Sequence, residues 1–321
     1  MALLKSKLAR NPAADRLFIL SSQLPSLLVL LGYLVVGFGL SQVLSLLLML
    51  ASVGSEEAIT NMLQHPEQYP DAWDLLMTSQ LINATILFIV TPYLYLRLSE
   101  KIRFKWLFYK QVRKDLLAFI ILLLVFVYLP LSAWVTYQNE HIVLPEALSG
   151  LETLLRNTEQ QLRNMTLFLI QFEGLAQFFV ALLVIAAIPG FGEELLFRGV
   201  LQNKLYALFK NQHVAIWLAA FVFGAIHLQF YGMLTRTLLG ALFGYLYVYS
   251  GNLFYPMLLH FLNNAITLIF TRLVIMGEQE EELTDLIETP AIPILYALLS
   301  LVGTLALVYW FRKRAIKPQW V

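Results

Sequence analysis

Long apolar runs are the feature that most limits the folds open to this chain. A helix that crosses a bilayer needs about 20 apolar residues, because each residue adds only about 1.5 Å of length. We find eight such runs, with ends set to within about four residues. They cover 26–51, 78–97, 115–137, 174–192, 213–230, 234–250, 253–272 and 291–311. We therefore predict an all-α polytopic membrane protein with about eight transmembrane helices.

Composition supports this class and excludes several others. The 321 residues are 59% hydrophobic and 13% charged, whereas a soluble domain carries about 25% charged residues. The absence of cysteine excludes disulfides, thiolate metal sites and a cysteine nucleophile. A net charge of +1 gives no indication of a nucleic-acid partner. We find no cleavable signal peptide, linker or repeat, so residues 1–321 are expected to form a single membrane domain.

Lys and Arg are divided unevenly between alternate loops. They gather in the N-terminal segment, in the loop between the second and third runs, after the fourth run and at the C-terminus. In this order they are Lys5, Lys7, Arg10, Arg16; Lys101, Arg103, Lys105, Lys110, Arg113, Lys114; Lys204, Lys210; and Arg312, Lys313, Arg314, Lys317. The first loop and the loop at 277–288 are acidic. The positive-inside rule then places both termini in the cytoplasm.

We expect the chain to cross a membrane many times, and our hypothesis for this membrane is the inner membrane of a bacterium. Membrane lipid is the one partner that the sequence indicates. The segment 101–114 mixes aromatic and basic residues, and it would hold anionic lipid or serve only as a cytoplasmic anchor.

Few ionisable residues lie inside the apolar runs. All five aspartates fall in loops or at helix ends, which argues against an aspartyl intramembrane protease. A charged side chain at the bilayer centre costs at least about 2.5–3.5 kcal/mol, so it usually faces the bundle interior and has a function. The residues that meet this condition are Glu193, Glu194, Arg198, His227 and His260, with the amides Asn263 and Asn264 beside the last histidine.

The spacing along the chain predicts that these residues meet. If Lys204 marks the surface, Glu193 lies about 16 Å below it along a helix that continues beyond the fourth run. His227 would lie about 20 Å deep and His260 about 10 Å deep by the same rise. We therefore expect one cavity that opens to the cytoplasm. Pro189 and the glycine after it are expected to kink the fourth helix.

Helix periodicity sorts the side chains into pairs. Glu194 and Arg198 are four residues apart and can form an ion pair on one helix face. Phe223–His227 and His260–Asn264 have the same spacing. Glu193 is rotated about 100° from its neighbour and would keep an unpaired carboxylate.

These residues follow the pattern EExxxR, FxxxH and HxxxN, in that order and on separate runs. The pattern resembles the CPBP family of intramembrane endopeptidases. That family includes type II CAAX prenyl endopeptidases and bacterial proteins linked to bacteriocin immunity. The resemblance covers about 170–272, which we take as the catalytic core.

The resemblance implies a role for each matched residue. Glu193, assisted by His227, would activate water. His260 and Asn264 would stabilise the oxyanion. The remaining matched residues would support the site (Glu194, Arg198) or shape it (Phe223).

General chemistry leads to the same division of labour. Peptide hydrolysis needs a base, oxyanion donors and an acid for the leaving amine. Without cysteine or a nucleophilic serine motif, an activated water is the natural nucleophile. A zinc site formed by Glu193, His227 and His260 is the alternative, although the HExxH signature is absent. We expect no metal cofactor, and a peptide or protein substrate whose identity, prenylated or not, the sequence does not reveal.

Other functions use the same residues. Each polar residue, taken alone, more often forms a structural ion pair or an interhelical hydrogen bond than takes part in catalysis. A non-catalytic scaffold or immunity-type protein of the same fold is the main alternative to a peptidase. A proton-coupled transporter is a further alternative, weakened by the lack of inverted repeats.

Overall fold

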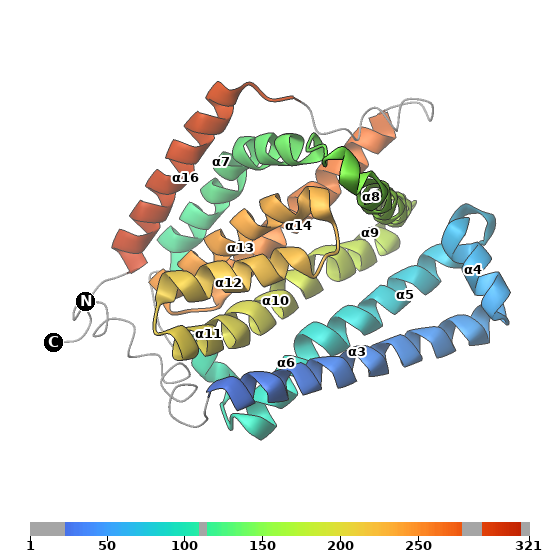
Figure 1. The fold of residues 1–321 in the computed structure, drawn as a ribbon, viewed down its shortest axis with the longest axis horizontal. Helices are drawn as coiled ribbons and strands as arrows, with labels where there is room; N and C mark the ends of the chain where they lie inside the picture. The colour runs from blue at the N-terminus through green and yellow to red at the C-terminus, as the bar shows by residue number, and fades with distance from the viewer. Residues whose placement is uncertain (1–22, 109–113, 278–290, 316–321) are drawn as a thin grey trace.

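A computed structural model describes residues 23–108, 114–277 and 291–315 (Figure 1). The longer helices are α3 (Gln23–Val53), α5 (Ala72–Thr85), α7 (Lys114–Glu140), α8 (Ser149–Ile170), α12 (Gln212–Ala225), α13 (Phe230–Ser250), α14 (Phe254–Gly277) and α16 (Ile294–Ala315). Shorter ones are α4 (Glu56–Gln64), α6 (Thr91–Leu94), α9 (Leu175–Ala181), α10 (Ile188–Glu194) and α11 (Gln202–Phe209). The described residues contain no strand, so the all-α prediction is confirmed.

Each of the eight predicted runs falls on a helical segment. Six of these segments, among the described residues, are long and apolar enough to cross a membrane. The other two runs fall on α12, which has only 14 residues, and on α13, which is less apolar because it contains an arginine and several Gly, Thr and Tyr residues. The fold is therefore that of a polytopic membrane protein. Two helices, α4 and α8, lie in segments between the predicted runs, where no helix was expected.

The fourth run is longer than its apolar composition suggests. Leu175–Phe209 forms one helical segment of 35 residues, so the helix continues past the two glutamates as predicted. It comprises α9, α10 and α11 joined by two π-helical stretches, Leu182–Ala187 and Leu195–Leu201. Such wide turns insert an extra residue into the helix and are frequent at functional sites.

Pro189 lies just after the first of these π-helical stretches. Proline cannot donate to the carbonyl four residues earlier, which here belongs to Ile185. The side-chain amide of Asn264 donates to that carbonyl at 3.4 Å instead. The predicted irregularity at Pro189 thus takes the form of a π turn, and α14 supplies the hydrogen bond that the proline removes.

Two glycines allow α10 to approach its neighbours closely. A Cβ atom on Gly190 would lie 2.8 Å from the backbone nitrogen of Phe261 in α14. A Cβ atom on Gly192 would lie 2.8 Å from the Cβ atom of Phe88, in the π-helical stretch Ile86–Val90 that follows α5. Small residues at such positions let helix backbones pack closely in a membrane bundle. The glycines therefore hold the helix that carries the acidic pair between two others.

Lys204 is not a surface residue, contrary to the prediction. Its Nζ atom lies 2.7 Å from Glu100, and both side chains are buried. The same carboxylate accepts hydrogen bonds from Ser26 and Tyr95 at 2.7 Å each. The start of α3 and the end of the second run therefore meet α11 at one end of the bundle. We call this the basic end, because the predicted cytoplasmic loops lie there.

The turn between α12 and α13 lies at the opposite end of the bundle (Figure 1). Asn139, near the end of α7, donates to the carbonyl of Phe230 at 2.9 Å. Glu159 of α8 accepts from the backbone N–H of Tyr231 at 3.2 Å. We call this the acidic end, because the first loop with its glutamates lies there too.

Part of the charge pattern lies outside the described residues. This applies to the basic N-terminal segment, to residues 109–113 of the second basic loop, to most of the acidic stretch 277–288 and to Lys317. The predicted cytoplasmic position of both termini stays a prediction.

The Glu100–Lys204 pair provides a test of this packing. Replacing Glu100 by Gln leaves the lysine charge buried without its counter-ion, which should lower the free energy of unfolding by about 3–5 kcal/mol. Adding Lys204→Met to the same chain should recover part of that loss. Thermal unfolding of the purified protein in detergent would measure both variants. In contrast, Glu140→Gln, which breaks the partly exposed pair with Arg163, should cost at most about 1 kcal/mol.

Candidate functional site

The carboxylate of Glu194 is the centre of the polar cluster. Its Oε1 atom accepts from Nη1 of Arg198 at 2.6 Å and from Nδ1 of His260 at 2.9 Å. The carboxylate and the guanidinium are completely buried, at 0% exposure. The predicted pair therefore exists, and the histidine of the third motif joins it from α14. Glu194 thus ties α10 to α14 through a charged hydrogen bond.

Glu193 faces the same imidazole from the other side. Its Oε2 atom lies 3.9 Å from Nε2 of His260, and this oxygen has no hydrogen-bond partner in the described structure. Its side chain is 9% exposed, so the carboxylate is buried, and at this distance it forms no hydrogen bond with the imidazole. The two adjacent glutamates therefore differ in their contacts: Glu194 accepts two hydrogen bonds through Oε1 and leaves Oε2 without a partner, whereas Glu193 accepts no hydrogen bond from the described residues.

Arg198 fixes the position of the engaged carboxylate. Besides its ion pair, its Nη2 atom donates to the backbone carbonyl of Gly240 in α13 at 2.8 Å. A Cβ atom at Gly240 would lie 3.1 Å from this nitrogen and 3.0 Å from the ring of Phe223. The absence of a side chain at 240 thus lets the guanidinium reach the backbone.

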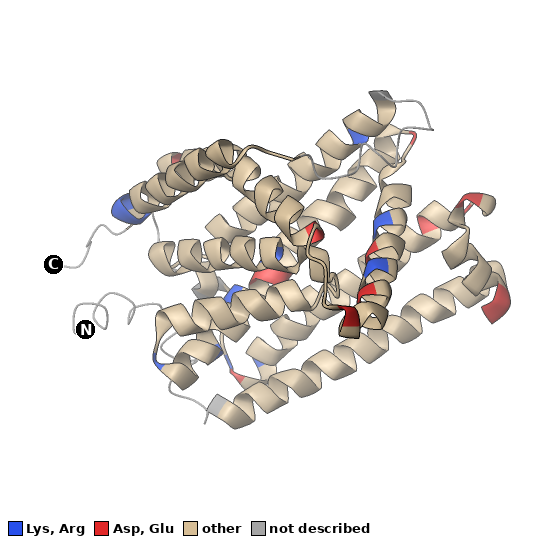
Figure 2. Cartoon of the chain, turned by 45° about the horizontal axis from the view of Figure 1, so that its top comes forward, with Lys and Arg blue, Asp and Glu red and all other residues tan. Residues whose placement is uncertain are grey.

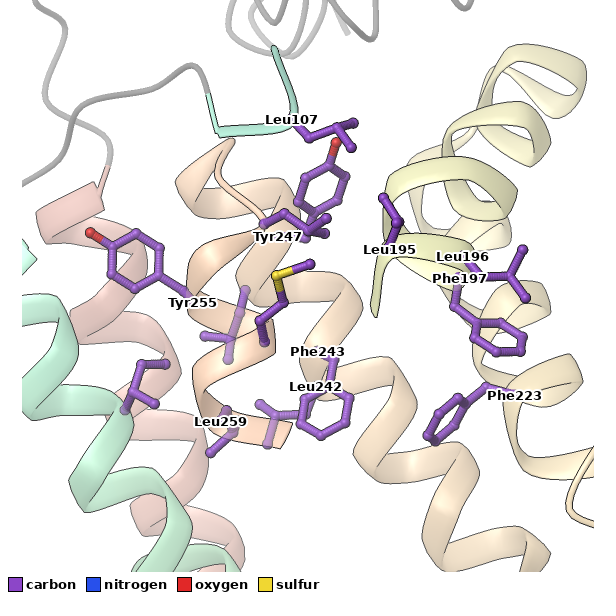
Figure 3. Packing of buried hydrophobic residues seen from close by; sticks show 14 of the residues in the cluster. Leu107, Leu195, Leu196, Phe197, Phe223, Leu242, Phe243, Tyr247, Tyr255 and Leu259 are labelled. Carbon is purple, nitrogen blue, oxygen red and sulfur yellow. The ribbon is translucent and has the colours of Figure 1, made fainter. Parts of the chain in front are cut away.

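Phe223 lies among all the polar groups of the site. Its ring is 5.3 Å from the imidazole of His227 and 5.8 Å from that of His260. The guanidinium of Arg198 lies 4.7 Å from the ring centre, within range of a cation–π contact. Figure 3 shows Phe223 next to Phe197, and the two ring centres are 5.3 Å apart. The aromatic side chain therefore joins the second motif to the first and the third.

His227 lies beyond the end of a helix, which corrects the prediction that it lies within a span. The helix α12 ends at Ala225, and His227 belongs to the turn before α13. Its Nδ1 atom is 2.8 Å from the carbonyl oxygen of Phe223. A carbonyl only accepts, so we assign the proton to Nδ1. In a neutral imidazole Nε2 then carries the lone pair and can act as a base.

The amides of the third motif are engaged with each other and with the fourth run. Asn264 donates to the Ile185 carbonyl and accepts from the amide of Asn263 at 3.3 Å. Its 3.4 Å bond is long, and the residue is half-buried one helical turn after His260. This placement fits both of the roles considered from the sequence, an interhelical hydrogen bond and an oxyanion donor.

Arg236 is a residue of the cluster that the sequence analysis missed. It lies on α13, inside the predicted run 234–250, so the rule for ionisable residues in spans applies to it as well. Its charge acts on both Glu193 and His227. Its guanidinium donates to the side-chain carbonyl of Gln229, two residues after the histidine.

The turn that carries His227 is tied to α8. The amide of Gln229 donates to Glu159 at 3.2 Å, and Glu159 also accepts from the N–H of Tyr231 in the first turn of α13. A carboxylate at this point satisfies a helix N–H that has no partner within its own helix. Burial raises the pKa of Glu159, and the hydrogen bond from Tyr231 opposes that rise. Leu228, in the same turn, adopts a left-handed backbone with φ of 55°.

The zinc alternative finds no support in the arrangement of ligands. Within the described ranges, no group of three or more His, Asp or Glu side chains is placed to hold a metal ion. His260 meets Glu193, whereas His227 contacts the cluster through Phe223. The expectation of a metal-independent site stays a prediction.

The depth prediction and the orientation prediction conflict. We expected the site to open to the cytoplasm and both termini to lie there. The turn with His227 lies with the end of α7 and with α8, at the acidic end, whereas α16 ends at the basic end (Figure 1). These positions test neither expectation alone, but a site that opens beside this turn is incompatible with holding both.

Comparison with known proteins identifies the segment that holds the site. Residues 175–266 match the family described as type II CAAX prenyl endopeptidase Rce1-like. An uncharacterized protein, YpbD of Bacillus subtilis (strain 168), is 36% identical over 80 residues. That alignment covers 24% of this chain and 38% of the relative. No solved structure matches the chain.

Gly190 provides a test of the close contact between α10 and α14. A methyl group at 190 would meet backbone atoms of Phe261, so the helices must separate. We expect Gly190→Ala to lower the free energy of unfolding by roughly 1–3 kcal/mol. In Gly39→Ala, where the added methyl meets nothing within 4 Å, stability should stay the same or rise. Equal unfolding midpoints for the two variants in detergent would contradict this account of the contact.

Proposed function

We propose that this chain, whose residues 175–266 belong to the Rce1-like family of type II CAAX prenyl endopeptidases, hydrolyses a peptide bond within its helix bundle. The family supports a CAAX-protease-like intramembrane endopeptidase, and the long apolar helices support a multi-pass membrane protein. A bacterial membrane is our proposed location. The matched segment covers under half of this chain and of its curated relative, so activity and substrate are part of the proposal.

One observation carries the proposal more than any other. Of two adjacent buried glutamates, Glu194 is held through Oε1 by Arg198 and His260, whereas Glu193 accepts no hydrogen bond from the described residues; each leaves Oε2 without a partner. A buried polar atom without a partner is costly and needs an explanation. A water molecule held by Oε2 of Glu193 provides such an explanation, because the carboxylate of Glu193 is then placed as a general base.

The reaction follows from the protons that the site can move. Glu193, with Nε2 of His227 as a second acceptor, takes a proton from water as the water oxygen attacks the peptide carbonyl carbon. The carbonyl oxygen becomes an oxyanion. Glu193 then returns the proton to the leaving nitrogen, the carbon–nitrogen bond breaks, and the products are a carboxylic acid and an amine. No metal ion and no covalent intermediate is part of this scheme.

Oxyanion stabilisation is the proposed task of His260 and Asn264. Glu194 accepts from Nδ1 of His260, so this ring nitrogen carries a proton. For Nε2 to donate as well, the ring must carry a proton on both nitrogens. The amide of Asn264 needs only to leave its long bond to Ile185 in order to donate to the oxyanion. Both donors lie on α14, one turn apart.

A scaffold or immunity-type protein of the same fold remains the alternative. It would use the Glu194–Arg198–His260 contacts only to hold the helices together, which those contacts do in any case. The carboxylate of Glu193, which accepts no hydrogen bond from the described residues, has no task under that alternative. The effect of replacing Glu193 on peptide cleavage therefore distinguishes the peptidase from the scaffold.

Glu193→Gln is the first test of the peptidase. The amide keeps the shape of the side chain but cannot accept a proton, so peptide cleavage by the purified protein should fall by about 10²–10⁴-fold. Glu57→Gln, on the exposed helix α4, should cleave like the unaltered protein. If the unaltered protein and Glu193→Gln cleave the same peptides at the same rate, the assignment is wrong. Running each reaction with and without a chelator tests the metal-independent scheme as well.

Asn264→Ala tests the oxyanion role separately. The loss of one oxyanion donor typically costs about 10²–10³-fold in kcat. We expect that fall with little change in KM, whereas Asn263→Ala, which alters the neighbouring amide, should retain most activity. A variant at 264 that unfolds at lower temperature but keeps its kcat would show that this amide is only a structural link.

A further inference from the structure

The route by which a peptide reaches Glu193 is limited by packing on one side. Towards the basic end, the carboxylate is followed by a continuous layer of buried side chains in η7, the π-helical stretch Leu195–Leu201. Phe197, Phe223 and Phe243 close this layer between η7, α12 and α13 (Figure 3), and all three are almost fully buried. A close-packed interior of this kind leaves no path for a polypeptide.

The other side of the site has a different character. Here α12 ends after 14 residues, and a short non-helical turn with His227 replaces further helix. The side chain next to the histidine, Leu228, is 74% exposed, and Ile226 before it is also exposed. The reactive groups are therefore approached from the acidic end, beside α8, rather than through the aromatic layer.

Charge determines which compartment this end faces. The basic end contains Lys101, Arg103 and Lys210 from the predicted cytoplasmic loops. The last helix, α16, also ends there, with Arg312, Lys313 and Arg314 in its last turn, and Figure 2 shows Lys and Arg gathered at the helix end next to the C-terminus. The first loop, at the acidic end, has several carboxylates and no Lys or Arg. The only Lys or Arg residues in the loop that contains α8 are Arg156 and Arg163, and both are paired with glutamates. By the positive-inside rule the acidic end is extracytoplasmic.

We infer that the site of this protein opens to the extracytoplasmic face, and that its substrate is a polypeptide segment presented there. This inference deepens the proposed function. The statement about a substrate rests on the proposed peptidase activity, whereas the orientation of the site does not. It replaces the cytoplasmic opening that we expected from depth alone. The carboxylates of the first loop at this end favour the approach of segments with Lys or Arg over acidic ones.

The chain is well suited to a direct test because it contains no cysteine. Leu228 and Lys210 flank α12 at its two ends; both are exposed and both have a positive φ. Single variants Leu228→Cys and Lys210→Cys therefore make a matched pair. Val143→Cys, in the exposed α7–α8 loop, marks the acidic end independently. Each full-length variant is expressed in bacterial spheroplasts and treated with a membrane-impermeant maleimide before and after permeabilisation.

We expect the cysteines at 228 and 143 to react in intact spheroplasts and the cysteine at 210 to react only after permeabilisation. The reverse pattern would place the site at the cytoplasmic face and overturn the inference. Labelling at 210 in intact spheroplasts would also count against it. So would a cysteine at 228 that reacts only after denaturation, because the turn would then be closed to water.

Turnover is assessed in a second arm that separates the two proposals. A membrane-impermeant peptide with Lys beside the cleaved bond is added to intact spheroplasts that express the unaltered protein or Glu193→Gln. Cleavage that depends on Glu193 supports both the extracytoplasmic opening of the site and the proposed peptidase activity. Outward labelling at 228 without cleavage of any peptide by the purified protein would leave the orientation intact and contradict the proposed function.

Discussion

The rest of the site depends on a single buried carboxylate, that of Glu194. It joins Arg198 on its own helix to His260 on α14, and Arg198 in turn joins the backbone of α13. Burying charges in a bundle costs several kcal/mol per ion by approximate estimates, and attraction offsets that cost only when geometry and hydrogen bonds are nearly complete. These contacts leave little freedom in the relative positions of three helices, which suits a site that must hold reacting groups in place.

Local irregularities make this arrangement possible. The fourth helix contains π-helical stretches before and after α10, and Pro189 removes one hydrogen bond that α14 replaces through Asn264. Regular α-helix would rotate the residues after the proline to other angles. Glycines at 190 and 240 then let backbone and guanidinium come close. Departures from ideal helix thus coincide with the functional motif, as is common for π-helical turns.

Much of this could be predicted from the sequence, because the membrane imposes simple rules. The apolar runs gave the helices, and intramembrane charge gave Glu193, Glu194, Arg198 and His260 as neighbours. The rest depends on three-dimensional packing. Lys204 seemed a surface marker because lysine is rarely buried, yet Glu100 from a distant helix neutralises it. His227 seemed helical because the apolar run extends to 230, but α12 ends at 225. Arg236 also lies inside a predicted run, so the rule that ionisable residues in apolar runs are candidates for the site applies to it too.

The depth of a residue along a helix is insufficient to predict the membrane face from which a substrate reaches the site. Counting residues from one helix end gives a distance from one membrane face. It does not say on which side of the site packed side chains block the entry of a substrate. Glu193 lies near the middle of its 35-residue segment, so its distance to each face is similar. The aromatic layer around Phe223 blocks one direction, and the early end of α12 opens the other. A half-length helix followed by a non-helical turn therefore determines access more directly than depth.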